Sequence, residues 1–163
     1  MKKIITDIEN FIWLGGNGQQ HSIDDILLEI KKYTRKGGKI FVGTDSMTYP
    51  SKCHFACVIA LHSTNPKVAR YFYKKIKLDG DKYKNLQVKI FKEVEYSVMM
   101  ADFLREQFPN ADIEVHVDIG ENTRSETRKF IQSVRGWILS SGFRLKIKPE
   151  SWAASSVADS HTK

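Results

Sequence analysis

The sequence has few cysteines and no long apolar run, and each shortage argues against a class of protein. Cys53 and Cys57 are four residues apart, about 13 Å along a strand, which is too far for a disulfide. We therefore expect two buried free thiols. The chain has no CxxC or His-rich spacing that would indicate a structural zinc site. No apolar run approaches about 18 residues, so we expect no transmembrane helix and no membrane partner.

The amino-terminal residues carry no targeting signal that we can identify. Acidic Asp7 comes too early for a signal peptide, which makes a cytoplasmic protein the expectation. The chain has 163 residues, of which 41% are hydrophobic and 28% charged. These values are typical of a single folded domain, so we expect one domain over 1–163, with 1–38 forming an amino-terminal arm plus a helix. The sequence does not indicate an oligomeric state.

Basic residues exceed acidic ones. The net charge is +7 and the isoelectric point about 9.4. This balance suits a polyanionic partner such as nucleic acid, because phosphates attract basic surfaces over long range.

The first predicted helix has clear boundary signals. Ser22 is placed to cap a helix over 23–33, and Gly37-Gly38 to end it. The segment before the helix is predicted to be an irregular arm. We expect its aromatic residues, Phe11 and Trp13, to pack on the domain.

The remainder of the chain alternates between strand-like and helical patterns. Short turn sequences between the first three strands favour an antiparallel meander. The predicted elements are strands 39–46, 53–62 and 69–78, helix 86–108, strand 113–119, a helix opened by the capping-box pattern 123–126 and ending near 141, strand 143–147, and a short helix 152–158. This order predicts an α/β protein whose mixed five-stranded sheet, three antiparallel strands followed by β-α-β crossovers, is flanked by helices. It is the order of the ribonuclease H-like fold.

Three acidic residues fall in separate predicted elements of this sheet and its long helix: Asp45, Glu93 and Asp118. Asp45 and Asp118 interrupt apolar strand-like runs, where a carboxylate is costly unless it is paired or binds a metal. Convergent carboxylates suit hard divalent cations, and such sites are typical of phosphoryl-transfer chemistry. Structural hydrogen bonds or ion pairs are the alternative.

The long predicted helix carries two candidate glutamates. Glu93 falls at the edge of the apolar stripe, beside Leu86 and Leu104, whereas Glu95 lies nearer Asp102 on the far side. Glu93 is therefore better placed to face the sheet. An ordinary glutamate at the boundary of the buried face remains the alternative.

Several motifs together resemble the bacterial YkuK-type family, which is classed as ribonuclease H-like. The resemblance runs from about Lys39 to the carboxyl end. It rests on Gly43-Thr44-Asp45-Ser46, Lys89-Ile90 with Glu93, His116-Val117-Asp118-Ile119-Gly120, Thr127-Arg128, Lys146-Ile147-Lys148-Pro149, Ala154-Ser155-Ser156-Val157-Ala158-Asp159 and Thr162-Lys163.

The resemblance implies a catalytic carboxylate set. Asp45, Glu93 and Asp118 match the family's strand and helix acids, and Asp159 would be the late fourth carboxylate. Together they would hold two Mg²⁺ or Mn²⁺ ions, with Asp45 shared between them, for hydrolysis of phosphodiesters. His161 would correspond to a late, mobile proton carrier, although a frayed terminus is equally compatible with the sequence.

Other candidate site residues are polar or basic. His116 shares a strand face with Asp118 and could orient it, although a packed histidine fits equally. Arg124, Arg128 and Arg135 fall within about 40° on the second predicted helix, a stripe that could face phosphates or simply solvent. Lys163 is a further candidate for nucleic-acid binding. Lys74, Lys75 and Lys77 could bind phosphates or blunt an exposed strand.

Three functions remain open. The first is a metal-dependent nuclease acting on RNA or DNA. The second is a non-catalytic nucleic-acid-binding module that keeps the fold and the charge. The third is an interaction or regulatory protein whose carboxylates bind a metal structurally. Fold alone does not decide among them.

Overall fold

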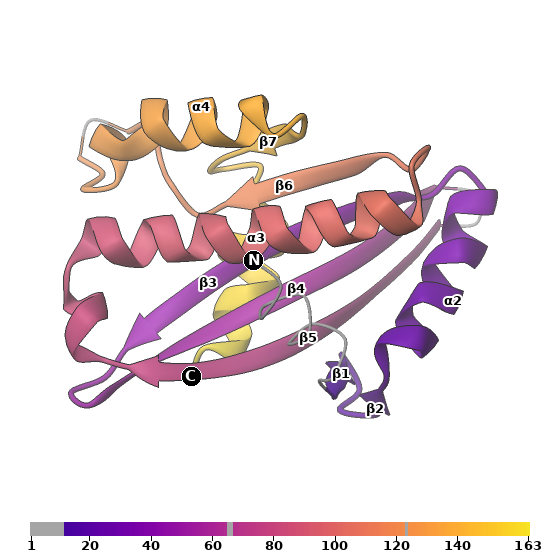
Figure 1. Cartoon of the computed structure of the whole chain (residues 1–163), viewed down its shortest axis with the longest axis horizontal. Helices are drawn as coiled ribbons and strands as arrows, with labels where there is room; N and C mark the ends of the chain where they lie inside the picture. Colours follow the sequence, from indigo (N-terminus) through magenta and orange to yellow (C-terminus); the bar gives the residue numbers. More distant parts are fainter. Residues whose placement is uncertain (1–11, 65–66, 123) are drawn as a thin grey trace.

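The computed structural model describes residues 12–64, 67–122 and 124–163 (Figure 1). Its seven-stranded sheet has the order β2-β1-β5-β4-β3-β6-β7. The strands are β1 (Trp13–Gly15), β2 (Gln20–His21), β3 (Lys39–Thr48), β4 (Lys52–Thr64), β5 (Lys67–Asp79), β6 (Ile113–Val117) and β7 (Arg144–Lys146). The α-helices are α2 (Ile23–Arg35), α3 (Leu86–Gln107) and α4 (Ile131–Ser140). Short 3₁₀-helices form η1 (Asp81–Lys84), η2 (Arg128–Phe130) and η4 (Asp159–His161), and a short π-helix forms η3 (Ala153–Ala158), which confirms the short helix predicted over 152–158.

The five central and carboxyl-side strands follow the predicted plan. β3, β4 and β5 pair antiparallel, whereas β3–β6 and β6–β7 are parallel. The mixed sheet predicted from the order of the elements is therefore confirmed. It has two more strands than expected, because β1 pairs with the outer edge of β5 and β2 pairs with β1.

The segment predicted to be an irregular arm is thus partly ordered into strands. Leu14 pairs with Tyr73 of β5, and Trp13 is 1% exposed in the core. The expectation that Trp13 packs on the domain is confirmed. Phe11 lies outside the described residues.

The helix α2 begins and ends where the sequence indicated. Ser22 Oγ accepts a hydrogen bond from the Asp25 backbone N–H (3.1 Å), and the Asp25 carboxylate accepts one from the Ser22 N–H (3.0 Å). Each bond satisfies a backbone donor that the first helical turn leaves unpaired. After the helix, Gly37 adopts φ +73°, a left-handed conformation that glycine takes without steric cost.

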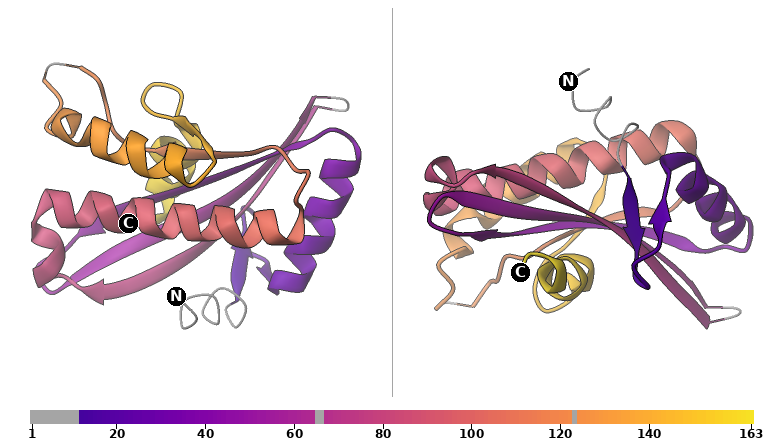
Figure 2. Two further views of the ribbon diagram at one scale, coloured as in Figure 1. Left: turned by 45° about the horizontal axis from the view of Figure 1, so that its top comes forward. Right: turned by 90° about the horizontal axis from the view of Figure 1, so that it is seen from below.

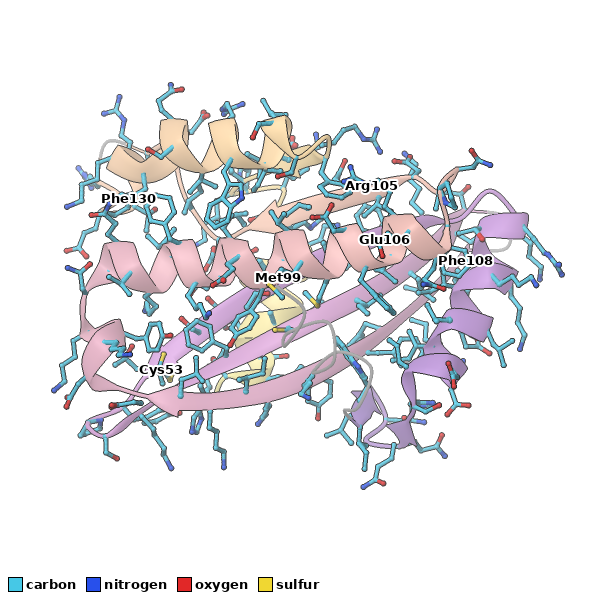
Figure 3. The ribbon with its side chains drawn as sticks, viewed as in Figure 1. Cys53, Met99, Arg105, Glu106, Phe108 and Phe130 are labelled. Carbon is cyan, nitrogen blue, oxygen red and sulfur yellow. The ribbon has the colours of Figure 1, made fainter. Side chains whose placement is uncertain are left out.

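The long helices cover one face of the sheet, and the short carboxyl-terminal helices cover the other (Figures 1 and 2). On the helical face, α3 packs residues such as Ile90, Val94 and Leu104 against the apolar side chains of β3, β4 and β6. Phe130, at the start of α4, contacts Phe91 of α3 in a T-shaped arrangement with ring centroids 6.4 Å apart (Figure 3). This packing fixes α3 over the strands that carry the candidate carboxylates.

The opposite face packs against η3. Phe41, Ala56, Val58 and Ala60 form a small apolar cluster with alanines of η3. At Gly43 an added Cβ would come within 2.8 Å of the Ala154 backbone nitrogen. Glycine is therefore required there for β3 and η3 to approach, and η4 follows directly after η3.

The second long helix starts later than predicted. Thr123 lies outside the described residues, and the residues after it form turns until η2 and α4. The hydroxyl side chains that follow Thr123 bond groups within the loop. Thr127 Oγ1 accepts a hydrogen bond from the Gly120 N–H (3.1 Å), and the hydroxyls of Ser125 and Thr127 bond each other (2.7 Å). Hydroxyl side chains readily bond nearby backbone groups in this way, which favours a turn over a helix.

The sequence also predicted the state of the two cysteines and whether any helix could span a membrane. Cys53 and Cys57 are both free and buried, as predicted, and burial raises the pKa of Cys57 to about 12. Within the described residues, none of the helices is both long and apolar enough to cross a bilayer.

Candidate functional site

Asp45 and Asp118 occupy neighbouring positions on two parallel strands. The last registered pair of β3 and β6 is Thr44 with Val117, so the two aspartates follow it side by side. Side chains alternate along a strand, and both carboxylates belong to the face that carries Gly43, toward η3. The fold thus brings together the two acids that interrupt apolar runs in the sequence.

Glu93 reaches this edge from α3. β6 ends at Val117 while β3 continues to Thr48, so the ladder between them stops just before Asp45. Ser46, on the helical face of β3, donates a hydrogen bond to Glu93 Oε1 (2.5 Å). One helical turn later, Ser97 donates to Thr44 Oγ1 (3.0 Å). Glu93 is 5% exposed, whereas Glu95 forms a surface ion pair with Lys92.

Asp159 approaches from the carboxyl-terminal turn η4. That turn is held on β4 and β5 by two contacts. The His161 ring stacks on Tyr73 with centroids 3.5 Å apart, and the Thr162 carbonyl accepts a hydrogen bond from His54 Nδ1 (3.3 Å). The turn is therefore docked rather than frayed, and Asp159 lies close enough to Asp45 to act on it electrostatically.

The carboxylates destabilise one another's charged forms. Burial raises the pKa of Asp45 to about 7, with the charges of Asp118 and Asp159 adding to the effect. Burial also raises the pKa of Glu93 well above its usual value, again with the charges of Asp45 and Asp118 contributing. A cation placed among these oxygens would relieve both the burial and the repulsion, so this all-oxygen donor set fits Mg²⁺ or Mn²⁺.

The described carboxylates do not lie close enough together to form a complete coordination shell. Across 12–64, 67–122 and 124–163, no three His, Cys, Asp or Glu side chains lie close enough together to hold an ion. Some oxygens already have partners. Glu93 Oε1 accepts a hydrogen bond from the Ser46 hydroxyl, and the Lys148 ammonium lies 2.8 Å from Asp118 Oδ1. Metal binding at Asp118 would therefore require Lys148 to move, whereas Ser46 holds only Oε1 of Glu93 and leaves Oε2 for a metal ion.

Comparison with known proteins identifies the family of this chain. A family profile described as "Ribonuclease H-like" matches residues 21–163. The chain belongs to the ribonuclease H-like family. It is also similar to the Bacillus subtilis (strain 168) protein named "Uncharacterized protein YkuK", with 29% identity over 174 residues that cover 95% of this chain and 99% of the relative. The YkuK-type resemblance is thus confirmed. No solved structure matches the chain at a significant level.

Within this ribonuclease H-like fold, both ring nitrogens of His116 bond groups other than Asp118. The Ala153 N–H donates to His116 Nδ1 (3.1 Å), so the Nε2–H donates to Glu114 Oε1 (2.9 Å). Burial lowers the pKa of this imidazole, which favours the neutral ring. His116 therefore joins β6 to the short helix η3, which is the packed-histidine alternative rather than a role in orienting Asp118.

The three arginines do not form the stripe expected on one helix. Arg124 lies in a turn, Arg128 in η2 and Arg135 in α4, where it forms an ion pair with Glu121 (3.1 Å). The stripe was wrong because the loop replaces the first turns of the predicted helix. Arg128 also lines an open hollow of about 1030 Å³, in which Glu121 and Glu126 balance Arg128 and Lys129. That lining carries no excess positive charge for a polyanion.

The lysines of β5 divide between the two faces of the sheet. Lys74 is buried on the helical face beside Cys57. Lys75 and Lys77 are exposed and share the face of Asp45: the cross-strand row through Asp45 runs to Ala56 and then Lys75. Lys75 Nζ also donates to the carbonyl oxygen of Lys163 (3.2 Å), which places Lys163 in the same region.

Two residues that contact the candidate carboxylates were given no role from the sequence. Ser46 follows Asp45 directly, and strand alternation points it to the helical face, where Glu93 was expected. Lys148 lies within the motif Lys146-Ile147-Lys148-Pro149. Its contact with Asp118 depends on the register between β6 and β7, which no local pattern reveals.

Proposed function

We propose that this chain is a metal-dependent nuclease that hydrolyses phosphodiester bonds of RNA or DNA. The observation that carries the proposal is that Asp45 and Asp118 directly follow the last registered pair of β3 and β6. There the charges of Asp118 and Asp159 add to the raised pKa of buried Asp45, and the charges of Asp45 and Asp118 add to that of buried Glu93. Buried acids held together at a cost in repulsion are typical of functional sites.

Asp45, Glu93, Asp118 and Asp159 would hold Mg²⁺ or Mn²⁺, with two ions expected and Asp45 shared. Such ions supply activation of a water molecule and neutralisation of charge on the leaving 3′ oxygen. The chain's own residues position the acids. Ser46 fixes the Glu93 carboxylate, and the docked turn at His161 brings Asp159 to the face of Asp45.

Lys75, Lys77 and Lys163 would bind the nucleic-acid backbone. They lie on the Asp45 side of the sheet, so a strand bound along them would pass the carboxylates. Lysine contacts of this kind bind phosphate without reading base sequence.

A non-catalytic nucleic-acid-binding module is the second candidate. The ion pair between Lys148 and Asp118 favours it, because that carboxylate already has a cationic partner. In this alternative the acids stabilise the fold, and the basic residues alone carry the function.

The experiment that separates these candidates is a cleavage assay with purified protein. Labelled single-stranded RNA, single-stranded DNA, both duplexes and an RNA–DNA hybrid are incubated with Mn²⁺, Mg²⁺ or EDTA. The wild type is compared with Asp45→Asn, Asp118→Asn and a control, Glu95→Gln, which neutralises a surface acid two residues from Glu93.

Metal-dependent cleavage that is lost in both aspartate variants and kept in Glu95→Gln supports the nuclease and names its substrate. Because the carboxylates would act as a unit, each aspartate variant should lose at least about 10³-fold in rate. Binding to nucleic acid without cleavage of any substrate favours the second candidate.

A further inference from the structure

Lys148 supplies a positive charge to one of the candidate metal ligands. Its Nζ lies 2.8 Å from Asp118 Oδ1, an oxygen that is inaccessible to solvent. The approach is an ion pair without hydrogen-bond geometry. The Asp118 side chain is 20% exposed and that of Lys148 is 51% exposed. The lysine thus reaches from solvent to a largely buried carboxylate.

The backbone fixes this lysine opposite Asp118. The β6–β7 ladder pairs Glu114 with Arg144 and His116 with Lys146, so its continuation by two residues sets Asp118 beside Lys148. The Lys148 N–H donates to the Ile119 carbonyl (2.9 Å), directly after Asp118. The contact is therefore specified by the register of the sheet and does not depend on a freely rotating surface side chain.

Neighbouring lysines do not have this contact. Lys146, two residues earlier, pairs with Glu150 at 2.8 Å. Lys89, one helical turn before Glu93, lowers the pKa of Asp45 and Glu93 through its charge. Lys89 therefore acts on the same site only through its electrostatic field. It is a matched control for Lys148, which contacts a candidate ligand oxygen directly.

We propose that Lys148 is an internal counterion that a divalent cation must displace from Asp118. The proposal rests on the nuclease function above, since it assumes that Asp118 is a metal ligand. An ammonium and a metal ion compete for one carboxylate because both are attracted to its single negative charge and the two cations repel each other at that distance. Lys148 is thus a positioning residue: it holds Asp118 in place until the metal ion arrives, and it weakens metal binding.

The test is isothermal titration of full-length protein with Mn²⁺ at pH 7.5 and low salt. Lys148→Met should bind Mn²⁺ about 10-fold more tightly than the wild type, because the competitor is gone. Lys148→Arg, which keeps the charge, should stay near wild type. Lys89→Met should change the affinity by less than about 3-fold, because it alters only the surrounding field.

Thermal melting in EDTA gives a second readout. Without Lys148, the buried Asp118 oxygen loses its cation, so Lys148→Met should melt below the wild type in EDTA and recover with Mn²⁺. A lysine that only tied the loop after β7 to β6 would lower the melting temperature equally with and without Mn²⁺. If Lys148→Met does not fold, Lys148→Gln keeps a polar group and makes the same comparison.

The outcomes separate this inference from the function on which it rests. Mn²⁺ binding by the wild type that Lys148→Met leaves unchanged or weakens overturns the counterion role alone. Equal tightening in Lys148→Met and Lys89→Met also overturns it, because the effect is then one of net charge. Failure of the wild type and every variant to bind Mn²⁺ overturns both proposals.

Discussion

Ser46 donates a hydrogen bond of 2.5 Å to Glu93, and this contact joins β3 to α3 directly beneath the candidate site. Ser46 and Glu93 are both buried, at 8% and 5% exposed. The bond therefore satisfies a polar group that could not otherwise reach water, and it fixes the carboxylate next to the strand that carries Asp45.

Removing this hydroxyl should cost stability and metal affinity together. Ser46→Ala leaves a buried carboxyl without its donor, so we expect a loss of about 1–3 kcal/mol in the free energy of unfolding and weaker Mn²⁺ binding. Ser97→Ala is the control, because Ser97 donates to Thr44 and touches no candidate ligand. It should lose about 1 kcal/mol with Mn²⁺ affinity unchanged. Urea unfolding and metal titration measure both quantities; equal loss of affinity in the two variants would contradict the assigned role of Ser46.

Asp45 should make the metal-free protein less stable as the pH rises. Burial holds its folded-state pKa at about 7, against an ordinary value of 3.8. Between these values the folded state keeps a proton that the unfolded state has released, so stability falls from about pH 4 to about pH 7. Asp45→Asn lacks this titration and should exceed wild type at pH 8 in EDTA by on the order of 2–4 kcal/mol.

Urea unfolding at pH 4 and pH 8 checks this expectation. The advantage of Asp45→Asn should shrink toward pH 4, where the aspartate is protonated in the folded state and increasingly so in the unfolded state. A difference that is the same at both pH values would show that Asp45 is not the titrating group.

Gly43 should tolerate no side chain. The Cβ of alanine would come within 2.8 Å of the Ala154 nitrogen and 2.9 Å of the Ala153 carbonyl carbon, both backbone atoms of η3. Gly43→Ala should therefore displace η3 and cost about 1–3 kcal/mol. Gly136→Ala in α4 has open space around the new Cβ and should gain about 0.5–1 kcal/mol from helix propensity. Thermal melts of both variants decide; a neutral Gly43→Ala would contradict the close approach.

The exposed lysines of β5 should carry part of the affinity for nucleic acid. Lys75→Met with Lys77→Met should weaken binding to all sequences alike and reduce the salt dependence by about one counterion for each lysine. A double control, Lys31→Met in α2 with Lys36→Met at its C-cap, removes the same charge from exposed positions elsewhere. Fluorescence anisotropy at several salt concentrations measures both effects. Equal losses in the two pairs would show that net charge, and not this face, determines binding.

Much of the fold could be predicted because its main strands and helices are long. β3, β4, β5 and α3 extend over ten or more residues, and short turn sequences separate the three strands. β1 and β2 have three and two residues, too few for alternation to show, and their pairing with β5 is a tertiary contact. The late start of α4 was missed because Ser125 and Thr127 use their hydroxyls within the loop.

Some residues of the candidate site could be identified from the sequence, and others could not. Asp45 and Asp118 were identifiable because a carboxylate in an apolar strand is conspicuous, and Glu93 because it borders a helical stripe. Lys148 was not, because its contact follows from the parallel pairing of β6 with β7. The docking of His161 on Tyr73 likewise joins residues far apart in the sequence, so a frayed terminus could not be distinguished beforehand.

The most direct test of the metal-dependent nuclease is to locate the metal itself. Crystals of the protein grown with Mn²⁺ and measured near the manganese absorption edge give an anomalous difference map. A catalytic metal site predicts one or two strong peaks among Asp45, Glu93, Asp118 and Asp159, with Lys148 moved away from Asp118. Mn²⁺ bound only at other positions, or Lys148 still on Asp118 with no peak beside Asp45, would contradict it.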